Sequence, residues 1–288
     1  MRNELSRGQI EFYQDNGFVV IDDFLDGAEV DHLRQILTEA VAARGEAVLP
    51  KDYYAEKTAA PHRPVSEMRS NDDRRQLLSA FYKRRPSWVR MLAQTMNLWQ
   101  TDERVRQFSL DPRLGRIACE LGDVDGVRLW HDQTLIKPPW GDATGWHLDT
   151  PAFSFTHPGT STFWIALVDT DLRNGCMHYI AGSHKLRLMT TGNWRLDGLR
   201  LLNPDWEFAD PVPCPVRAGG LIVHHGWVAH GAGANITPSP RPALSITWLP
   251  QGATFNGVQN ILPDEVYAGL RVGDPLEFDD LNPVVYRR

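Results

Sequence analysis

The chain has 288 residues, of which 42% are hydrophobic and 23% charged, and its formal net charge at pH 7 is −6. These values are typical of a globular protein with a sizeable core; they lack the basic excess of a nucleic-acid-binding protein, and no apolar run reaches the length of a membrane span. Three widely spaced cysteines and an N-terminus without an apolar signal segment predict a reduced, cytoplasmic protein.

The beginning of the chain predicts two helices with a short strand between them. A helical pattern stops at residues 15–17, where the sequence is DNG, and an apolar strand follows over residues 18–24. Residues 26–43 predict the second helix, because their apolar side chains form one stripe: Val30, Leu33, Leu37 and Val41.

The next hundred residues alternate between irregular and helical patterns. Residues 44–70 mix Gly, Pro and charge without a period, which predicts a long loop. Residues 71–121 predict a return to helix. The last of these helices has Asp111 as its N-cap, Pro112 in its first position and Gly122 just beyond its end.

From residue 127 onward the pattern changes to short β-type runs separated by turn residues. No stretch between them is long enough for the helix of a βαβ unit, so the pattern favours an antiparallel sandwich or barrel over a parallel sheet. A long insertion over residues 185–215 interrupts the series. The runs are VRLWHDQTLIK, GWHLDTPAF, TSTFWIALVDT, MHYIAGSH, GGLIVHHGW and RPALSITWL.

Metal-ligand chemistry is indicated by His147 and Asp149 in the second of these runs. Residues two apart in a strand point to the same face, so an imidazole and a carboxylate would lie side by side as two ligands for a divalent metal. A third ligand must then come from elsewhere, and three candidates occur close together: His224, His225 and His230.

An arginine follows these histidines at the head of an alternating run. Arg241 would share one strand face with Ala243, Ser245 and Thr247, and an arginine on an inward face needs an anion. Two histidines and one carboxylate form the facial triad of non-heme Fe(II) oxygenases, which leaves positions open for an acid co-substrate and O2. A non-catalytic module that binds Zn2+ or Ni2+ through the same ligands is the alternative, although it would not need Arg241.

Nearly the whole chain resembles the phytanoyl-CoA dioxygenase family of Fe(II)/2-oxoglutarate oxygenases. The segments that carry the resemblance are FYQDNGFVVIDDFLDGAEVDHLR, MNLW, DQTLIKPPWGDATGWHLD, FWIALVDTDLRNGCMHYIAGSHK and HHGWVAHGAGANITPSPRPALSITW. The resemblance implies a mostly β fold with flanking α, namely a double-stranded β-helix (jelly-roll, cupin-like) core with an N-terminal helical layer. It also implies Fe(II), 2-oxoglutarate and O2 as cofactor and co-substrates.

The resemblance also implies roles for individual residues. The iron ligands would be His147, Asp149 and His230, with His225 as the alternative third ligand. The distal carboxylate of 2-oxoglutarate would bind Arg241. Two further side chains, Gln133 and Trp164, would lie against the co-substrate, with plain packing as their alternative role.

Two departures from the family pattern concern the co-substrate. Ala232 stands where family members often have Ser, and we find no match for a Lys that some members use. Four side chains near the ligands are candidates for the substrate pocket: Trp146, Thr150, Phe153 and Lys137, of which Lys137 could equally face solvent.

We therefore expect one oxygenase domain over residues 1–288. It would comprise a helical layer (1–125), a jelly-roll core (126–255) and a C-terminal tail (256–288), with lids at 44–70 and 185–215. The expected reaction hydroxylates an unactivated C–H of a small metabolite or natural-product intermediate and converts 2-oxoglutarate and O2 to succinate and CO2. Desaturation, epimerisation and ring formation share the same ligands and remain alternatives, and the oligomeric state stays open.

Overall fold

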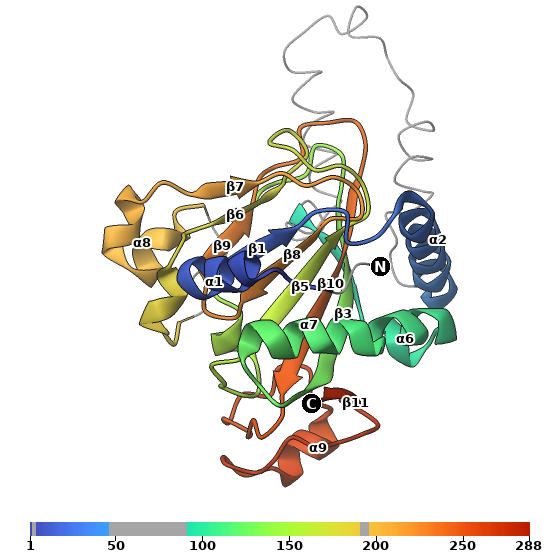
Figure 1. The fold of residues 1–288 in the computed structure, drawn as a ribbon, viewed down its shortest axis with the longest axis vertical. Coiled ribbons are helices and arrows are strands. Elements are labelled where there is room, and N and C mark those ends of the chain that lie inside the picture. Colours follow the sequence, from blue (N-terminus) through green and yellow to red (C-terminus); the bar gives the residue numbers. More distant parts are fainter. Residues whose placement is uncertain (2–3, 46–90, 191–195) are drawn as a thin grey trace, which may run out of the picture.

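The computed structural model describes residues 1, 4–45, 91–190 and 196–288. Most of the predicted loop 44–70 and the first part of the predicted helical stretch 71–121 lie outside these residues, so the lid predicted at 44–70 is not described. Within the described part, two antiparallel sheets carry the fold and helices lie against one of them (Figure 1). None of the described helices is long and apolar enough to cross a membrane.

The two N-terminal helices form where the sequence pattern predicts them. Helix α1 (Arg7–Asn16) ends at Gly17, whose φ of 81° is accessible to glycine, and strand β1 (Phe18–Ile21) follows directly. Helix α2 (Gly27–Arg44) begins after the N-cap Asp26 and buries its predicted stripe. Further along the chain are η2 (Leu98–Gln100), α6 (Glu103–Ser109) and α7 (Pro112–Gly122).

Seven strands form the major sheet in the order β1-β8-β5-β10-β3-β11, with β2 also pairing with β3. Strand β10 lies between β5 and β3, and its alternation places Leu244, Ile246 and Trp248 in the core under the helices. Besides β1, the strands of this sheet are β2 (Ala93–Met96), β3 (Gly126–Lys137), β5 (Ser161–Ala166), β8 (Leu221–His225), β10 (Arg241–Pro250) and β11 (Val284–Arg287).

Four strands form the minor sheet in the order β4-β9-β6-β7. They are β4 (Thr144–His147), β6 (Met177–Tyr179), β7 (Val212–Cys214) and β9 (His230–Ala232). Between them lie the short helices η3 (Thr150–Ala152), η4 (Ser183–Leu186), α8 (Gly198–Leu202) and η5 (Pro204–Phe208). An apolar cluster that includes Trp164, Tyr179 and Ile222 joins the two sheets.

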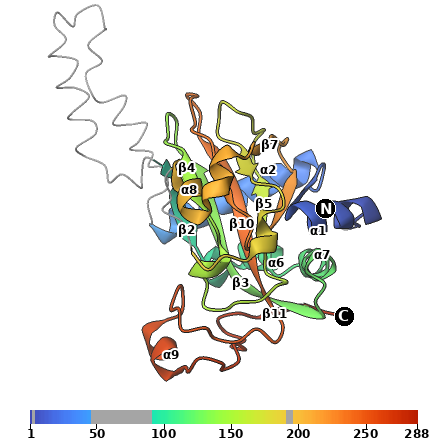
Figure 2. The same cartoon turned by 90° about the vertical axis from the view of Figure 1, so that its left-hand side faces the viewer.

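Helices α1, α2, α6 and α7 contribute to the largest apolar cluster together with the outer face of the major sheet. In Figure 2, α1 and α7 lie on one side of strands β10 and β3, and β4 and α8 lie on the other side. This arrangement confirms the expected mostly β jelly roll with a helical layer. The helices cover the outer face of the sheet, so the inner faces of the two sheets are left to build a site.

Three segments differ from the sequence-based prediction. Residues 93–96 form strand β2 instead of helix, because they pair with β3. Residues 212–214, inside the predicted insertion 185–215, form β7 of the minor sheet. The expected tail over 256–288 contains α9 (Asp264–Gly269) and β11, which pairs with β3. For the strands β2, β7 and β11, a partner distant in sequence determines the structure, and local periodicity does not report it.

Candidate metal centre

The paired strands β4 and β9 bring two histidines together. His147 ends β4 and His230 begins β9, and the two residues are direct cross-strand partners whose ring centroids are 4.1 Å apart. Nδ1 of His147 lies 2.9 Å from the carbonyl oxygen of Gly145, and Nδ1 of His230 lies 3.0 Å from that of Val228. Because a carbonyl only accepts, each ring carries its proton on Nδ1 and its lone pair on Nε2.

Asp149 joins this pair by a route that the sequence argument did not anticipate. The residue lies beyond the end of β4 in a helical turn with φ −80° and ψ −53°, so strand alternation does not place it. Instead, its backbone N–H and that of Thr150 donate to the carbonyl of Gly226, at 3.0 and 2.8 Å. The turn after β8 therefore holds Asp149 beside the two histidines.

The three side chains form a compact cluster of metal-ligating atoms. Oδ1 of Asp149 lies 3.6 Å from Nε2 of His147 and 3.7 Å from Nε2 of His230. One ligand atom from each residue lies within 4.8 Å of the others. Two imidazole nitrogens and one carboxylate oxygen are suitable donors for a divalent first-row metal, so the residues fit such an ion.

Burial and charge set the protonation of this cluster. Burial lowers the pKa of His147 and of His230, the latter well below its ordinary value, which favours neutral rings that can act as ligands. Burial alone would raise the pKa of Asp149. The imidazoles of His230, His224 and His147 outweigh it, with a hydrogen bond from His224, and hold the pKa of this carboxyl well below its usual range.

A cavity of about 100 Å³ opens from the cluster between the two sheets. Arg241, Gln133 and Trp164 all line it, so the structure brings the three predicted co-substrate residues and the three predicted ligands to one space. The residues that line it with them are Leu92, Gln94, Leu135, Thr144, Thr162, Met177, His224, Gly231, Ala232 and Ser245.

Arg241 is a buried cation in need of an anion. Its side chain is 2% exposed, its guanidinium carbon lies 5.1 Å from the centroid of the Trp164 ring, and Nε and Nη1 meet no hydrogen-bond acceptor among the described residues. Burial lowers the pKa of Arg241 to about 10, so the group remains charged at neutral pH. Unpaired buried donors on a planar cation fit the carboxylate of a ligand.

A threonine that the sequence analysis did not single out faces the same cavity. Thr144 is the cross-strand partner of Ala232, the position where related proteins often have Ser. Its Oγ1 accepts a hydrogen bond from Nζ of Lys137 at 3.2 Å, and the Lys137 ammonium also donates to the carbonyls of Asp142 and Met91. A hydroxyl that accepts from an ammonium keeps its own proton to donate.

The four residues predicted for a substrate pocket are not among those that line this cavity. Trp146 packs in an apolar cluster with Trp227, and Phe153 packs against Phe155 with ring centroids 5.6 Å apart. Thr150 is buried in η3, and Lys137, rather than facing solvent, is fully buried behind Thr144. Their part in substrate binding stays a prediction.

The remaining histidines near the cluster have separate roles. His225, the alternative third ligand, points elsewhere: its Nε2 lies 2.8 Å from the carbonyl oxygen of Pro158, and its Nδ1 accepts from the backbone of Trp227. His184 contacts the carbonyl oxygen of Gln14 through Nε2 at 3.1 Å, which ties η4 to α1. His131 lies 3.3 Å from the Thr247 hydroxyl, behind the cluster.

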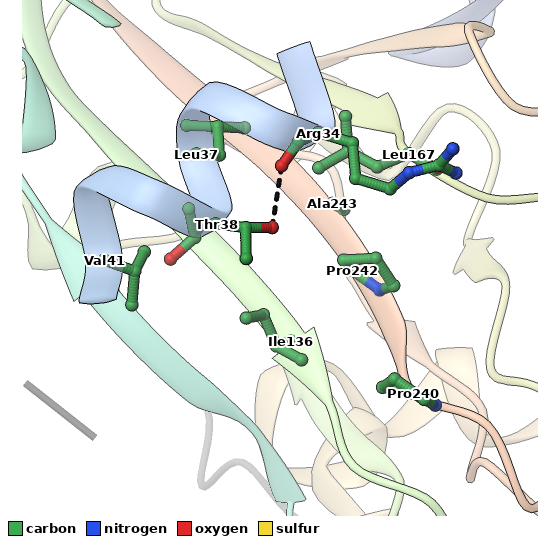
Figure 3. A pocket seen from close by; sticks show the side chains of 10 residues that line it. Arg34, Leu37, Thr38, Val41, Ile136, Leu167, Pro240, Pro242 and Ala243 are labelled. Atoms are coloured by element: carbon green, nitrogen blue, oxygen red, sulfur yellow. Dashed lines mark hydrogen bonds between the residues drawn. The ribbon is translucent and has the colours of Figure 1, made fainter. Parts of the chain in front are cut away.

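A second cavity, of about 280 Å³, lies between α2 and the strands β3 and β10 (Figure 3). Leu37, Val41, Ile136 and Pro242 give it a largely apolar lining. The guanidinium of its one lining arginine, Arg34, bonds to the Leu167 carbonyl and to Asp31. Among the described residues that line this cavity, Arg34 is the only titratable side chain.

Fold and cluster together define a class of protein: a jelly roll with a candidate two-histidine, one-carboxylate metal centre. The model of the phytanoyl-CoA dioxygenase (PhyH) family matches residues 13–243, and the chain belongs to this family. A phytanoyl-CoA dioxygenase of Arabidopsis thaliana is 25% identical over 84% of this chain and 88% of its own length.

Two solved structures resemble the chain over almost its full length. The first is the non-heme α-ketoglutarate-dependent carbocyclase SnoK from nogalamycin biosynthesis, with a TM-score of 0.72, 27% identity, and coverage of 98% of this chain and 96% of SnoK. The second is the epimerase SnoN in complex with Fe3+, α-ketoglutarate and nogalamycin RO, with a TM-score of 0.69, 25% identity, and coverage of 96% and 97%.

Proposed function

We propose that this protein is an Fe(II)- and 2-oxoglutarate-dependent oxygenase that acts on a small molecule. The observation that carries the proposal is the presence, in one buried cavity, of both the His147–Asp149–His230 cluster and the guanidinium of Arg241, whose Nε and Nη1 meet no acceptor among the described residues. A plain metal site needs no buried cation. A co-substrate that binds a metal at one end and carries a carboxylate at the other needs both.

His147, Asp149 and His230 would hold the iron, and Arg241 would pair with the distal carboxylate of 2-oxoglutarate. When bound, the iron would supply the oxidative chemistry that couples 2-oxoglutarate decarboxylation to attack on a C–H bond. The protein's own residues would bind and orient the co-substrate. Trp164 supports the guanidinium plane, Thr144 offers a hydroxyl donor, and the apolar side chains of Leu92, Leu135 and Met177 limit water in the cavity.

Hydroxylation is the reaction that we propose first. Ring formation and epimerisation are the second candidate, because the two structural relatives with 27% and 25% identity are a carbocyclase and an epimerase. The same ligands serve all of these reactions, and the pose of the substrate decides among them. Product mass separates them: hydroxylation adds one oxygen atom, ring formation or desaturation removes two hydrogen atoms, and epimerisation leaves the mass unchanged.

Anaerobic titration with Fe(II) and 2-oxoglutarate tests the proposal. We expect a weak visible charge-transfer band at about 500 nm, as in other Fe(II) centres that bind this co-substrate through two oxygens. His147→Ala should abolish the band. Arg241→Met should keep iron binding but raise the Kd for 2-oxoglutarate by at least about tenfold, because a charged hydrogen-bonded pair is lost.

Arg128→Met is the matched control, because Arg128 is also buried but bonds to Asp279 and to the Asn282 carbonyl, among residues that do not line the cavity. The control should leave the Kd for 2-oxoglutarate unchanged. Iron binding without any 2-oxoglutarate-dependent band in the wild type would reject the oxygenase and favour a metal-binding module.

A further inference from the structure

The two carboxylate oxygens of Asp149 have different surroundings. Oδ1 faces the Nε2 atoms of His147 and His230. Oδ2 accepts a hydrogen bond from Nε2 of His224 at 3.1 Å and another from the hydroxyl of Thr162 at 3.0 Å. A carboxylate oxygen has two lone pairs, so these two donors fill the acceptor capacity of Oδ2.

A tyrosine from the opposite sheet fixes the proton of His224 on the nitrogen that faces Asp149. The phenol oxygen of Tyr179 lies 3.1 Å from Nδ1 of His224. Burial raises the pKa of Tyr179 well above its ordinary value, so the phenol keeps its proton and donates it. With Nδ1 accepting, a neutral His224 ring carries its proton on Nε2 and donates to Asp149.

The hydroxyl of Thr162, on β5, is oriented in a comparable way by a residue of the adjacent strand β10. Its hydroxyl lies 3.2 Å from that of Thr247, and the Thr247 hydroxyl lies 3.3 Å from Nε2 of His131. Since Thr162 donates to Asp149, its oxygen accepts from Thr247. Both donors to Oδ2 are therefore oriented by hydrogen-bond partners, Tyr179 on the opposite sheet and Thr247 on the adjacent strand β10, and are not free to turn away.

We propose that His224 and Thr162 are positioning residues that make Asp149 a one-oxygen ligand, and that they thereby keep coordination positions open for the co-substrate. This inference rests on the proposed function, because it concerns positions that only a metal-binding co-substrate and O2 would use. A carboxylate can bind a metal through one oxygen or both. Three single-atom ligands leave three of six positions open, whereas a two-oxygen Asp149 would leave two.

Removal of the donors should therefore impair co-substrate binding more than metal binding. The variant His224→Phe/Thr162→Val removes both hydrogen bonds to Oδ2. His224→Gln keeps an N–H donor and should restore much of the wild-type behaviour. Thr170→Val is the control, because Thr170 is also a buried threonine, but its hydroxyl bonds to Val216 at a distance from the cluster.

Two quantities are measured for each variant under anaerobic conditions: the Kd for Fe(II) alone, and the Kd of the Fe(II)-loaded protein for 2-oxoglutarate from the charge-transfer band. We expect the double variant to raise its 2-oxoglutarate Kd by more than about tenfold and to raise its Fe(II) Kd by a smaller factor.

An unchanged 2-oxoglutarate Kd in the double variant would overturn the inference, and so would a loss of Fe(II) binding that accounts for the whole effect. If His224→Phe prevents folding, Thr162→Val alone is compared with Thr170→Val by the same two measurements. A wild-type protein without any 2-oxoglutarate-dependent band would instead reject the proposed function, so the two failures are distinguishable.

Discussion

Lys137 and Arg241 are two buried cations at neighbouring positions in the major sheet, where they are direct cross-strand partners. Burial, and then the charge of Arg241, lower the pKa of Lys137 to about 7. Two cations without a buried carboxylate partner among the described residues are unfavourable unless an anion joins them. The burial of these two side chains therefore lowers the stability of the fold at this end of the cavity, which is typical of a binding site.

At the scale of single residues, we predict that Thr144 contributes the hydroxyl that Ala232 cannot. Thr144→Val should raise the Kd for 2-oxoglutarate by about tenfold, because a hydrogen bond to a charged carboxylate is lost. It should not change the Kd for 2-oxopentanoate, which has the same carbon chain without the second carboxylate. Both constants are obtained by anaerobic titration of the Fe(II)-loaded protein.

Two further variants make this comparison specific. Thr144→Ser keeps the hydroxyl and should bind 2-oxoglutarate as the wild type does. Thr95→Val is the control, since Thr95 is a buried threonine on β2 that does not line the cavity. An equal weakening of both oxo acids by Thr144→Val would show that Thr144 acts on the metal end or on folding, contrary to the prediction.

At the scale of elements, the turn between β8 and β9 determines where Asp149 lies. The carbonyl of Gly226 accepts from two successive N–H groups after β4, and the Gly226 N–H donates to Thr160 at 3.0 Å. Glycine is required here because a Cβ would lie 2.1 Å from Oγ1 of Thr150. The close approach of the backbone at Gly226 to the backbone at Asp149 and Thr150 therefore fixes the position of the Asp149 carboxylate, which no strand pairing fixes.

Gly226→Ala should therefore disturb the metal centre although residue 226 is not a ligand. We expect metal affinity to fall by at least about tenfold and the free energy of unfolding to fall by roughly 1–3 kcal/mol, the usual range for overpacking. Calorimetric metal titration and urea unfolding measure the two effects. Gly27→Ala is the control, because a Cβ at Gly27 meets nothing within 4 Å; equal effects of the two substitutions would contradict this explanation.

At the scale of the whole molecule, buried neutral histidines make stability depend on pH. Burial lowers the pKa of His131 and, together with the nearby His184, that of His225, each to about 4. Between pH 6.5 and 4 the unfolded chain binds more protons than the folded one, so the free energy of unfolding rises with pH in this window. The contribution is fully present above pH 6.5 and is lost as the pH falls towards 4.

We predict that the metal-free protein loses stability on acidification from pH 6.5 to 4, by at most about 3 kcal/mol for each of the two histidines. His131→Gln should flatten this dependence, because glutamine does not titrate. Urea unfolding followed by tryptophan fluorescence at several pH values measures the slope. The prediction would be wrong if the variant and the wild type lost stability in parallel.

Several features follow from short stretches of sequence. The N-cap Asp111 and the apolar stripe of residues 26–43 are local signals, and helices α7 and α2 form where these signals predict them. The alternation after Arg241 is also local, and β10 sends its two faces to the helical core and to the cavity as expected. Strand β2 was missed because its pairing with β3 is not encoded in its own periodicity.

The sequence by itself determined the jelly-roll class, the family, and the residues that gather in the cavity: His147, Asp149, His230 and Arg241. Only the tertiary structure decided how they meet. Hydrogen bonds to the Gly226 carbonyl place Asp149 beside the histidines, and Thr144 on the facing strand offers the hydroxyl that Ala232 lacks. The physical reason is that periodicity and caps act between residues close in the chain, whereas hydrogen-bond partners and ligand geometry depend on strands brought together from distant parts of it.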